Sequence, residues 1–354
     1  MTPELGLIEG FFGRPWSWAE RADTIRFLAP RGYGFYLYAP KADAHLRRRW
    51  REPHPEEVLA ELASLRETCR AEGVRFGIGL SPFELHLQPE AGWQDALARK
   101  LADLAQLRPD DIAILFDDMR GDVPDLAARQ AAIVQFAAER AGADRIFCCP
   151  SYYSDDPIVD AAFGERPPFY LEQLGRLLDP AIRIFWTGEE VCAREFSPGH
   201  LARIAGQLRR KPFLWDNYPV NDGARMAQHL HLRAFTGRPA AIAGQIAGHG
   251  VNPASQPVLS RIPALTLAES YRDGEAYEYG AAFARAARAV LGEDLAARVG
   301  RDLLALQDRG LDRLAERRAV LRARYAAFDH PAAREIMRWL DGHWAVTDEL
   351  VQTQ

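Results

Sequence analysis

The stretch Ala113–Asp122, AILFDDMRGD, runs four apolar residues directly into two adjacent carboxylates, Asp117 and Asp118. A short apolar run of this kind is typical of a buried strand. Paired aspartates also occur at Asp110-Asp111 and Asp155-Asp156, and most such pairs are solvated turns. The place of the pair in the fold therefore has to decide its role.

Short apolar runs recur along roughly the first 255 residues, and helical stretches separate most of them. The predicted strands are Leu5–Gly10, Gly34–Tyr38, Val74–Leu80, Ile112–Phe116, Arg145–Cys149, Ile182–Trp186, Pro212–Trp215 and Ala240–Ile246. The predicted helices are Ala22–Leu28, which follows a capping box from Ser17 to Glu20, and Pro55–Glu72, Trp93–Leu107, Leu126–Ala141, Tyr170–Leu178 and Pro198–Leu208.

Alternating strands and helices in this number are the signature of an α/β protein with a (β/α)8 TIM barrel. We predict this barrel, as the catalytic domain, over residues 1–270. The alternative is a doubly wound open sheet, but no glycine-rich phosphate loop follows the first strand. From residue 271 to 354 the composition turns to Ala, Leu, Arg and Glu, which predicts a C-terminal domain of three or four bundled helices.

Composition narrows the class of protein. The formal net charge of -5 argues against a nucleic-acid binder, and the basic run Arg47–Arg51 is expected to be solvated. No apolar run is long enough for a membrane span, and the N-terminus does not resemble a signal peptide. The sequence thus predicts a cytoplasmic protein that acts without a membrane.

The cysteines and one histidine are expected to play no chemical part. The four cysteines have no zinc-finger spacing, which suggests a reducing compartment, and Cys69, Cys148 and Cys192 are expected to be inert core residues. His249, between two glycines, is expected to lie on the surface.

Active sites of such barrels lie at the carboxyl ends of the strands. Asp117-Asp118 stands at such an end, together with Lys41, tyrosines, Trp215, Asn217 and Asp222. Two adjacent carboxylates repel, which favours a proton on one of them, as a general acid requires. Carboxylates, an aromatic platform and amides suit sugar hydrolysis. Metal binding is the competing use of the pair, but no histidine lies at ligand spacing from it.

The chain resembles glycoside hydrolase family 84, the β-N-acetylglucosaminidases that include the O-GlcNAcases and bacterial hyaluronidase-like enzymes. The motifs that carry the resemblance occur in family order over the predicted barrel. They are residues 9–16 (EGFFGRPW), 38–41 (YAPK), 50–52 (WRE), 115–118 (LFDD), 149–150 (CP), 186–188 (WTG), 215–217 (WDN) and 252–253 (NP).

The resemblance implies a retaining mechanism in which the 2-acetamido oxygen of the substrate attacks the anomeric carbon and forms an oxazoline. Asp117 would orient the acetamido group, and Asp118 would be the acid and then the base. Tyr153, favoured over Tyr152 by family spacing alone, would bind the acetamido oxygen. Trp215 and Cys149 would line the acetamido pocket, Thr187 would contribute to its wall, and the ring hydroxyls would be held by Gly10, Lys41, Asn217, Asp222 and Asn252. No metal or organic cofactor is implied.

The expected substrate is a terminal β-linked GlcNAc on a protein or glycan, and a hyaluronan fragment is the alternative substrate. A non-catalytic GlcNAc-binding or scaffold protein and a metal-dependent hydrolase on the same barrel are the alternatives. Composition and resemblance also suggest that the helical C-terminal region pairs two copies of the chain as a homodimer.

Overall fold

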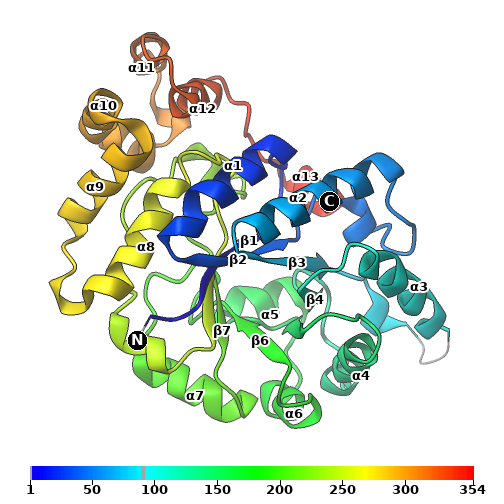
Figure 1. The fold of residues 1–354 in the computed structure, drawn as a ribbon. Coiled ribbons are helices and arrows are strands. Elements are labelled where there is room, and N and C mark those ends of the chain that lie inside the picture. The colour runs from blue at the N-terminus through cyan, green and yellow to red at the C-terminus, as the bar shows by residue number, and fades with distance from the viewer. Residues whose placement is uncertain (1, 89–91) are drawn as a thin grey trace.

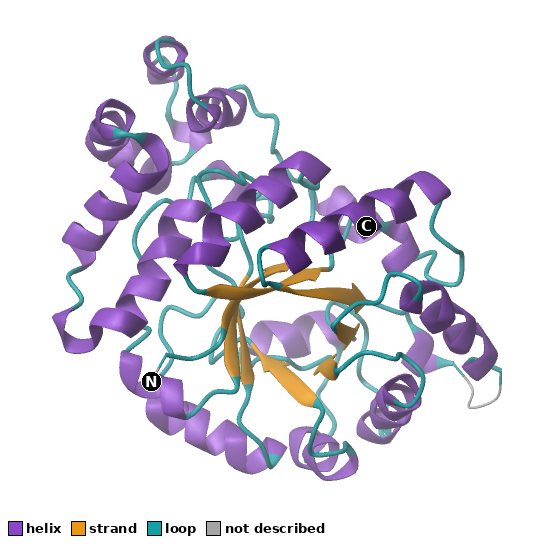
Figure 2. Ribbon diagram, in the orientation of Figure 1, coloured by secondary structure: helices purple, strands orange, loops and turns teal. Residues whose placement is uncertain are grey.

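The computed structural model describes residues 2–88 and 92–354. Parallel strands close into a barrel in the order in which they occur along the chain, and helices surround it (Figures 1 and 2). The strands are β1 (Leu5–Glu9), β2 (Tyr33–Tyr38), β3 (Arg75–Leu80), β4 (Asp111–Leu115), β5 (Arg145–Cys149), β6 (Arg183–Trp186), β7 (Phe213–Asp216) and β8 (Gly248–Val251). The prediction of a (β/α)8 barrel is therefore confirmed.

The helices of the barrel are α1 (Trp18–Leu28), α2 (Glu56–Ala71), α3 (Gln94–Ala105), α4 (Leu126–Ala138), α5 (Pro157–Phe163), α6 (Tyr170–Leu177), α7 (Pro198–Leu208) and α8 (Arg261–Asp273). The capping box before α1 is present, because the Ser17 hydroxyl accepts from the Glu20 amide and the Glu20 carboxylate accepts from the Ser17 amide. The sequence analysis did not predict α8, and it did not predict α5, which is short and lies between charged residues.

The prediction of the eighth strand was wrong. Residues Ala240–Gly244 form a 3-10 helix, and the strand is Gly248–Val251, which contains two glycines. The reason lies in the barrel interior, which large aromatic side chains fill. A Cβ at Gly248 would lie 2.3 Å from the Phe213 ring, and one at Gly250 would lie 2.4 Å from Ile8. Glycine at these positions lets β8 approach its neighbours, and the apolar signal of a strand is lost.

The region after the barrel is helical, as predicted, with more helices than the three or four expected. It contains α9 (Tyr279–Leu291), α10 (Glu293–Leu303), a π-helical turn (Leu304–Arg309), α11 (Arg317–Ala326), α12 (Pro331–Leu340) and α13 (Asp348–Thr353). Helices α9 to α12 project from the barrel as a lobe, whereas α13 lies back against the barrel (Figure 1). Apolar side chains of α9–α12 form a second core with Leu230, Leu232 and Val258.

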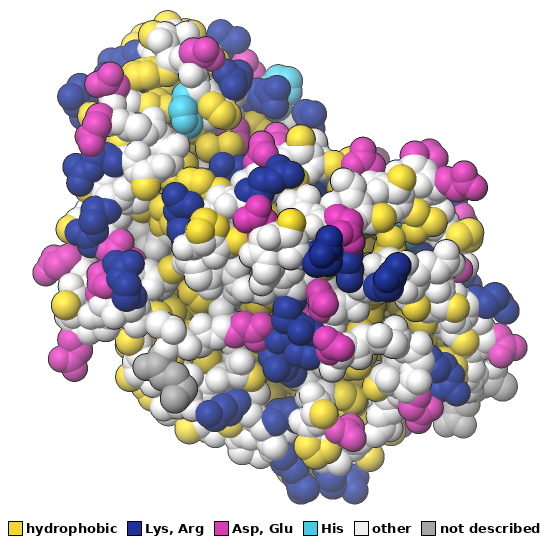
Figure 3. Space-filling model, viewed as in Figure 1, with side chains coloured by type: hydrophobic (Ala, Val, Ile, Leu, Met, Phe, Trp, Pro, Cys, Tyr) yellow, Lys and Arg dark blue, Asp and Glu magenta, His cyan; other side chains and the backbone are white. Residues whose placement is uncertain are grey.

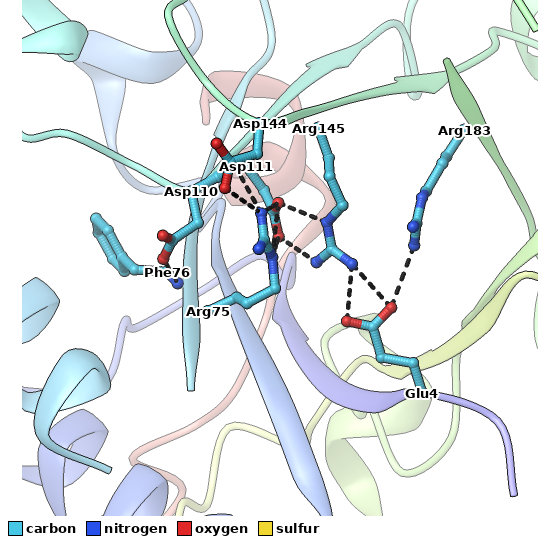
Figure 4. Close-up of polar contacts among 8 residues, drawn as sticks. All are labelled: Glu4, Arg75, Phe76, Asp110, Asp111, Asp144, Arg145 and Arg183. Atoms are coloured by element: carbon cyan, nitrogen blue, oxygen red, sulfur yellow. Dashed lines mark hydrogen bonds and ion pairs between the residues drawn. The ribbon is translucent and has the colours of Figure 1, made fainter. Parts of the chain in front are cut away.

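Ion pairs close the end of the barrel where the strands begin (Figure 4). The buried carboxylate of Asp111 accepts from Arg75 at 2.7 Å and from Arg145 at 2.7 Å. Arg145 and Arg183 also donate to Glu4, at 2.8 and 3.1 Å. Asp110-Asp111 thus has a structural role at the opposite end of the barrel from Asp117-Asp118.

On the face shown in Figure 3, positive and negative side chains are interspersed.

Removing Asp111 should destabilise the fold without touching the pocket. We expect Asp111→Ala to lower the free energy of unfolding by about 2 kcal/mol, because two guanidinium groups lose a buried partner. The full cost of a broken buried pair is not expected, since Arg75 is partly exposed and water can solvate it. Urea unfolding measures the change. Asp144→Ala, which removes a largely exposed partner of Arg75, is the control and should have less than about a quarter of the effect. Equal stability of Asp111→Ala and wild type would contradict the expectation.

Among the described residues, no helix combines the length and the apolar character that a membrane crossing requires.

Candidate active site

A pocket of about 140 Å³ lies at the carboxyl end of the barrel. All the predicted site residues line it: Gly10, Lys41, Asp117, Asp118, Cys149, Tyr153, Thr187, Trp215, Asn217, Asp222 and Asn252. Four lining residues were not predicted, namely Phe12, Val191, Cys192 and Val220. Phe12 lay within a quoted motif, whereas nothing in the sequence marked the other three.

The two carboxylates follow β4 after a single residue, Phe116. The backbone continues past Leu115, with the Phe116 amide donating to the Cys149 carbonyl of the neighbouring strand at 2.9 Å. This pairing carries the chain to the rim before it leaves the sheet. Asp118 then adopts a left-handed φ of 56°, which aspartate tolerates better than most residues. The turn directs both carboxylates into the same pocket.

Asp117 is buried and pairs with Lys41. Its Oδ2 accepts from the Lys41 ammonium, which itself is only 3% exposed. Within the described part of the chain, Asp117 Oδ1 has no hydrogen-bond partner although it is buried. Buried carboxylate oxygens are costly to leave unpaired. Oδ1 is therefore an acceptor available to a donor group that enters the pocket.

Asp118 is more exposed than Asp117 and has different partners. The Tyr153 hydroxyl donates to its Oδ1 at 3.0 Å, and Lys41 Nζ lies 3.6 Å from its Oδ2. Burial, followed by the charge of Asp118, raises the pKa of Tyr153 well above its usual value, so the phenol keeps its proton. Tyr152 points elsewhere, since its hydroxyl donates to the Gly164 carbonyl. Tyr153, rather than Tyr152, is the tyrosine of the pocket.

One wall of the pocket is a chain of amides around Trp215. The indole Nε1 donates to Asn217 Oδ1 at 3.1 Å, and Asn252 Nδ2 donates to the same oxygen at 2.9 Å. Asn252 Oδ1 in turn accepts from the Gly10 amide at 3.3 Å. These bonds fix the orientation of both carboxamides, and they link the ends of β1, β7 and β8 across the pocket.

Asp222 enters the pocket from the segment after β7. Its Oδ2 accepts from the Phe12 amide at 2.8 Å. Burial, with a smaller contribution from the charge of Asp118, raises the pKa of Asp222 to about 6. On the opposite side, burial raises the pKa of the Cys149 thiol well above its usual value, so Cys149 is an apolar wall rather than a nucleophile. Thr187 is buried and donates to the Tyr153 carbonyl at 3.3 Å.

A buried ionic cluster supports the Trp215 wall from behind. Asp216 accepts from Arg238 through both carboxylate oxygens and contacts His249 Nε2 at 3.0 Å, and His249 Nδ1 lies 2.8 Å from the Tyr271 hydroxyl. The expectation of a surface His249 was wrong, because the side chain lies in β8 and is fully buried. Arg238 also donates to the Ala193 carbonyl at 2.7 Å, which ties the loop after β6 to β7.

Two other expectations about single residues need correction. Cys192 is exposed and lines the pocket, so it is not a core residue. In the basic run, Arg47 is buried instead of solvated, and its Nη2 donates to the Asp118 carbonyl at 3.4 Å. The sequence could not show this, because charged runs carry no signal that separates one buried member from its exposed neighbours.

A (β/α)8 barrel with a carboxylate pair and a tryptophan-walled pocket at its carboxyl end has the site of a glycoside hydrolase. The family model described as beta-N-acetylglucosaminidase matches residues 5–304. The chain therefore belongs to the β-N-acetylglucosaminidases, glycoside hydrolase family 84.

Individual proteins agree with this assignment. The protein O-GlcNAcases of Rattus norvegicus and Mus musculus are each 28% identical to the chain over 276 residues, 75% of its length. The matched part is 30% of each relative, so the chain spans less than a third of their length. A solved O-GlcNAc hydrolase variant from Thermobaculum terrenum superposes with a TM-score of 0.79 at 29% identity, over 98% of this chain and 82% of that one.

Proposed function

We propose that the protein is a retaining β-N-acetylglucosaminidase that removes terminal β-GlcNAc from glycoprotein or glycan through an oxazoline intermediate. The observation that carries the proposal is the unequal pair of carboxylates. Asp117 is buried and paired with Lys41, and its Oδ1 has no partner among the described residues. Asp118 is more exposed and accepts a hydrogen bond from Tyr153. An acceptor beside a proton donor is what substrate-assisted hydrolysis needs.

In the first step, the acetamido oxygen of the sugar bonds to the anomeric carbon as the bond to the aglycone oxygen breaks. Asp117 Oδ1 accepts from the acetamido N–H, orients the group and stabilises the positive charge that develops there. Asp118 gives its proton to the departing oxygen. No protein nucleophile bonds to the sugar, unlike in the usual two-carboxylate scheme.

In the second step, Asp118, now a carboxylate, takes a proton from water. The water oxygen bonds to the anomeric carbon, and the oxazoline ring opens to the free acetamide. Two inversions at one carbon retain its configuration. Tyr153 donates to the acetamido oxygen. The methyl group of the acetamide is enclosed by Trp215, Cys149 and Thr187. The ring hydroxyls are bound by Gly10, Lys41, Asn217, Asp222 and Asn252.

The first experiment compares hydrolysis of an aryl N-acetyl-β-glucosaminide with that of its N-trifluoroacetyl analogue. We expect a steep loss of rate with the fluorinated acetamide, because fluorine withdraws electrons from the attacking carbonyl. Chelator should leave the rates unchanged. Equal rates would indicate a protein nucleophile, and absence of turnover would favour a binding protein.

Gly10 sets the position of the Trp215 ring, so its substitution should weaken binding. A Cβ at position 10 would lie 2.2 Å from Trp215 Cζ2, which forces the indole to move. We expect Gly10→Ala to raise KM at least about tenfold. Gly199→Ala, where a Cβ meets no atom of the described residues within 4 Å, is the matched control. An unchanged KM would show that the ring is free to move.

Affinity for the sugar should depend on pH through Asp222. Its pKa of about 6 makes the carboxylate anionic above that pH, when it accepts hydroxyl donors best. We expect the Kd of N-acetylglucosamine to rise severalfold as pH falls from about 7 to about 5. Calorimetric titration at each pH measures the Kd, and the rise of the Kd at low pH should vanish in Asp222→Asn. A rise that persists in this variant would assign the titration to another group.

We also propose a cytoplasmic location and a homodimer that pairs through the helical region, where Leu304 and Val320 are large exposed apolar residues. Light scattering tests the dimer, and the mass of a single chain would contradict it.

A further inference from the structure

The connection between β7 and β8 differs from the others around the barrel. Residues 217–247, all of which are described, contain 3-10 turns but no α-helix. This segment carries Asn217 and Asp222 into the pocket. An irregular segment cannot satisfy its own backbone hydrogen bonds as a helix does, so they must be satisfied from elsewhere.

The helical lobe supplies these partners through its π-helical turn. The side-chain oxygen of Gln307 accepts from the amides of Leu232 and Arg233, at 2.8 and 2.9 Å. The Gln307 carbonyl contacts His229 Nδ1 at 2.7 Å, and the Leu306 carbonyl accepts from the Leu230 amide at 3.0 Å. A π-turn leaves carbonyls free of the regular helical pattern, and here they serve the segment.

The segment that Gln307 holds reaches Asp222 in two further steps. The carbonyl of His229 accepts from Asn221 Nδ2 at 3.0 Å. Asn221 is 1% exposed and precedes Asp222 in the chain. The same carboxamide bonds to Gln256 Oε1 at 2.9 Å and accepts from the Ser255 amide at 3.0 Å, so it also fixes the chain just after Asn252.

We propose that Gln307 is a positioning residue for the sugar pocket, because its side-chain oxygen holds the Leu232 and Arg233 amides. It thereby fixes the segment from which His229, through Asn221, positions Asp222. The helical lobe thereby supplies backbone hydrogen bonds that an α-helix between β7 and β8 would otherwise have formed within itself. The proposal rests on the proposed function in one respect, because it assumes that Asp222 binds the sugar. It assigns Gln307 no contact with substrate.

A double-mutant cycle tests the relay. Gln307→Leu removes the side-chain oxygen that accepts from Leu232 and Arg233 and keeps a similar side-chain volume. Gln307→Glu keeps an oxygen at that place. Each variant is also combined with Asp222→Asn. We expect Gln307→Leu to raise the Kd of N-acetylglucosamine and the KM of an aryl N-acetyl-β-glucosaminide about tenfold, with kcat changed less than about twofold. The Glu variant should restore both to within about twofold. In the Asp222→Asn background, Gln307→Leu should have almost no further effect.

The control is Tyr325→Phe, which removes a hydrogen bond to Asp302 inside the lobe and no contact with the β7–β8 segment. It should leave Kd unchanged. The positioning role would be overturned if Gln307→Leu changed Kd equally in the wild-type and Asp222→Asn backgrounds. It would also be overturned if Tyr325→Phe changed Kd as much as Gln307→Leu does. An unchanged Kd in Gln307→Leu would do the same. Wild-type protein that binds the sugar without hydrolysing it would contradict the proposed function alone, since the cycle can be read on Kd. Wild-type protein that does neither would overturn both.

Discussion

Asp118→Asn is expected to lower kcat/KM about a thousandfold on a GlcNAc peptide or alkyl glycoside, because no group can then protonate the departing oxygen. The loss should be about tenfold or less on a nitrophenyl glycoside, whose leaving group needs little protonation. Asparagine fits the left-handed backbone at this position, so the fold should not be strained. Rates over a series of aryl glycosides measure the effect, which appears as a steeper dependence on leaving-group basicity.

The matched control is Asp122→Asn in the same loop, where the carboxylate pairs with Arg120 outside the pocket. Its rates should equal those of the wild type. An equal loss on all substrates in Asp118→Asn would remove the assignment of this residue as the acid.

Asp117→Asn is expected to lower kcat/KM by about a hundredfold to a thousandfold on every substrate, whatever its leaving group. Asp117 acts on the acetamido nucleophile, and the charge that it stabilises develops in each case. Loss of the carboxylate also leaves the buried ammonium of Lys41 without its closest partner. The same aryl series distinguishes the two aspartates, because the slope against leaving-group basicity should stay as in the wild type. A steeper slope would exchange the two roles.

The barrel could be predicted because its strands are short apolar runs that end in polar motifs at regular intervals. The prediction failed at β8, whose glycines make room for Phe213 and Ile8 and therefore carry no apolar signal. It also missed α5, a short helix at the rim, and α8 after the last strand. These misses have the same cause, since packing against distant residues, rather than local pattern, decides these segments.

The predicted site residues meet in one pocket because each stands at or near a strand end, and parallel strands bring those ends together. Their chemical roles stay predictions that the variants above test. Residues that support the site from outside were not predictable. His249, Asn221 and Gln307 owe their places to several hydrogen bonds between segments up to 78 residues apart in the chain, which no local pattern records.

The packed barrel interior has a kinetic consequence. Aromatic side chains fill the barrel beneath the pocket, with the Phe185 ring edge-on against Trp215, so the pocket is reached from the rim. If the protein hydrolyses GlcNAc glycosides as proposed, the sugar enters first and deepest, and the aglycone lies between it and solvent. Release must then be ordered, with the aglycone leaving before water attacks and the monosaccharide leaving last. Free N-acetylglucosamine should accordingly be a competitive product inhibitor, whereas the aglycone alone should inhibit weakly.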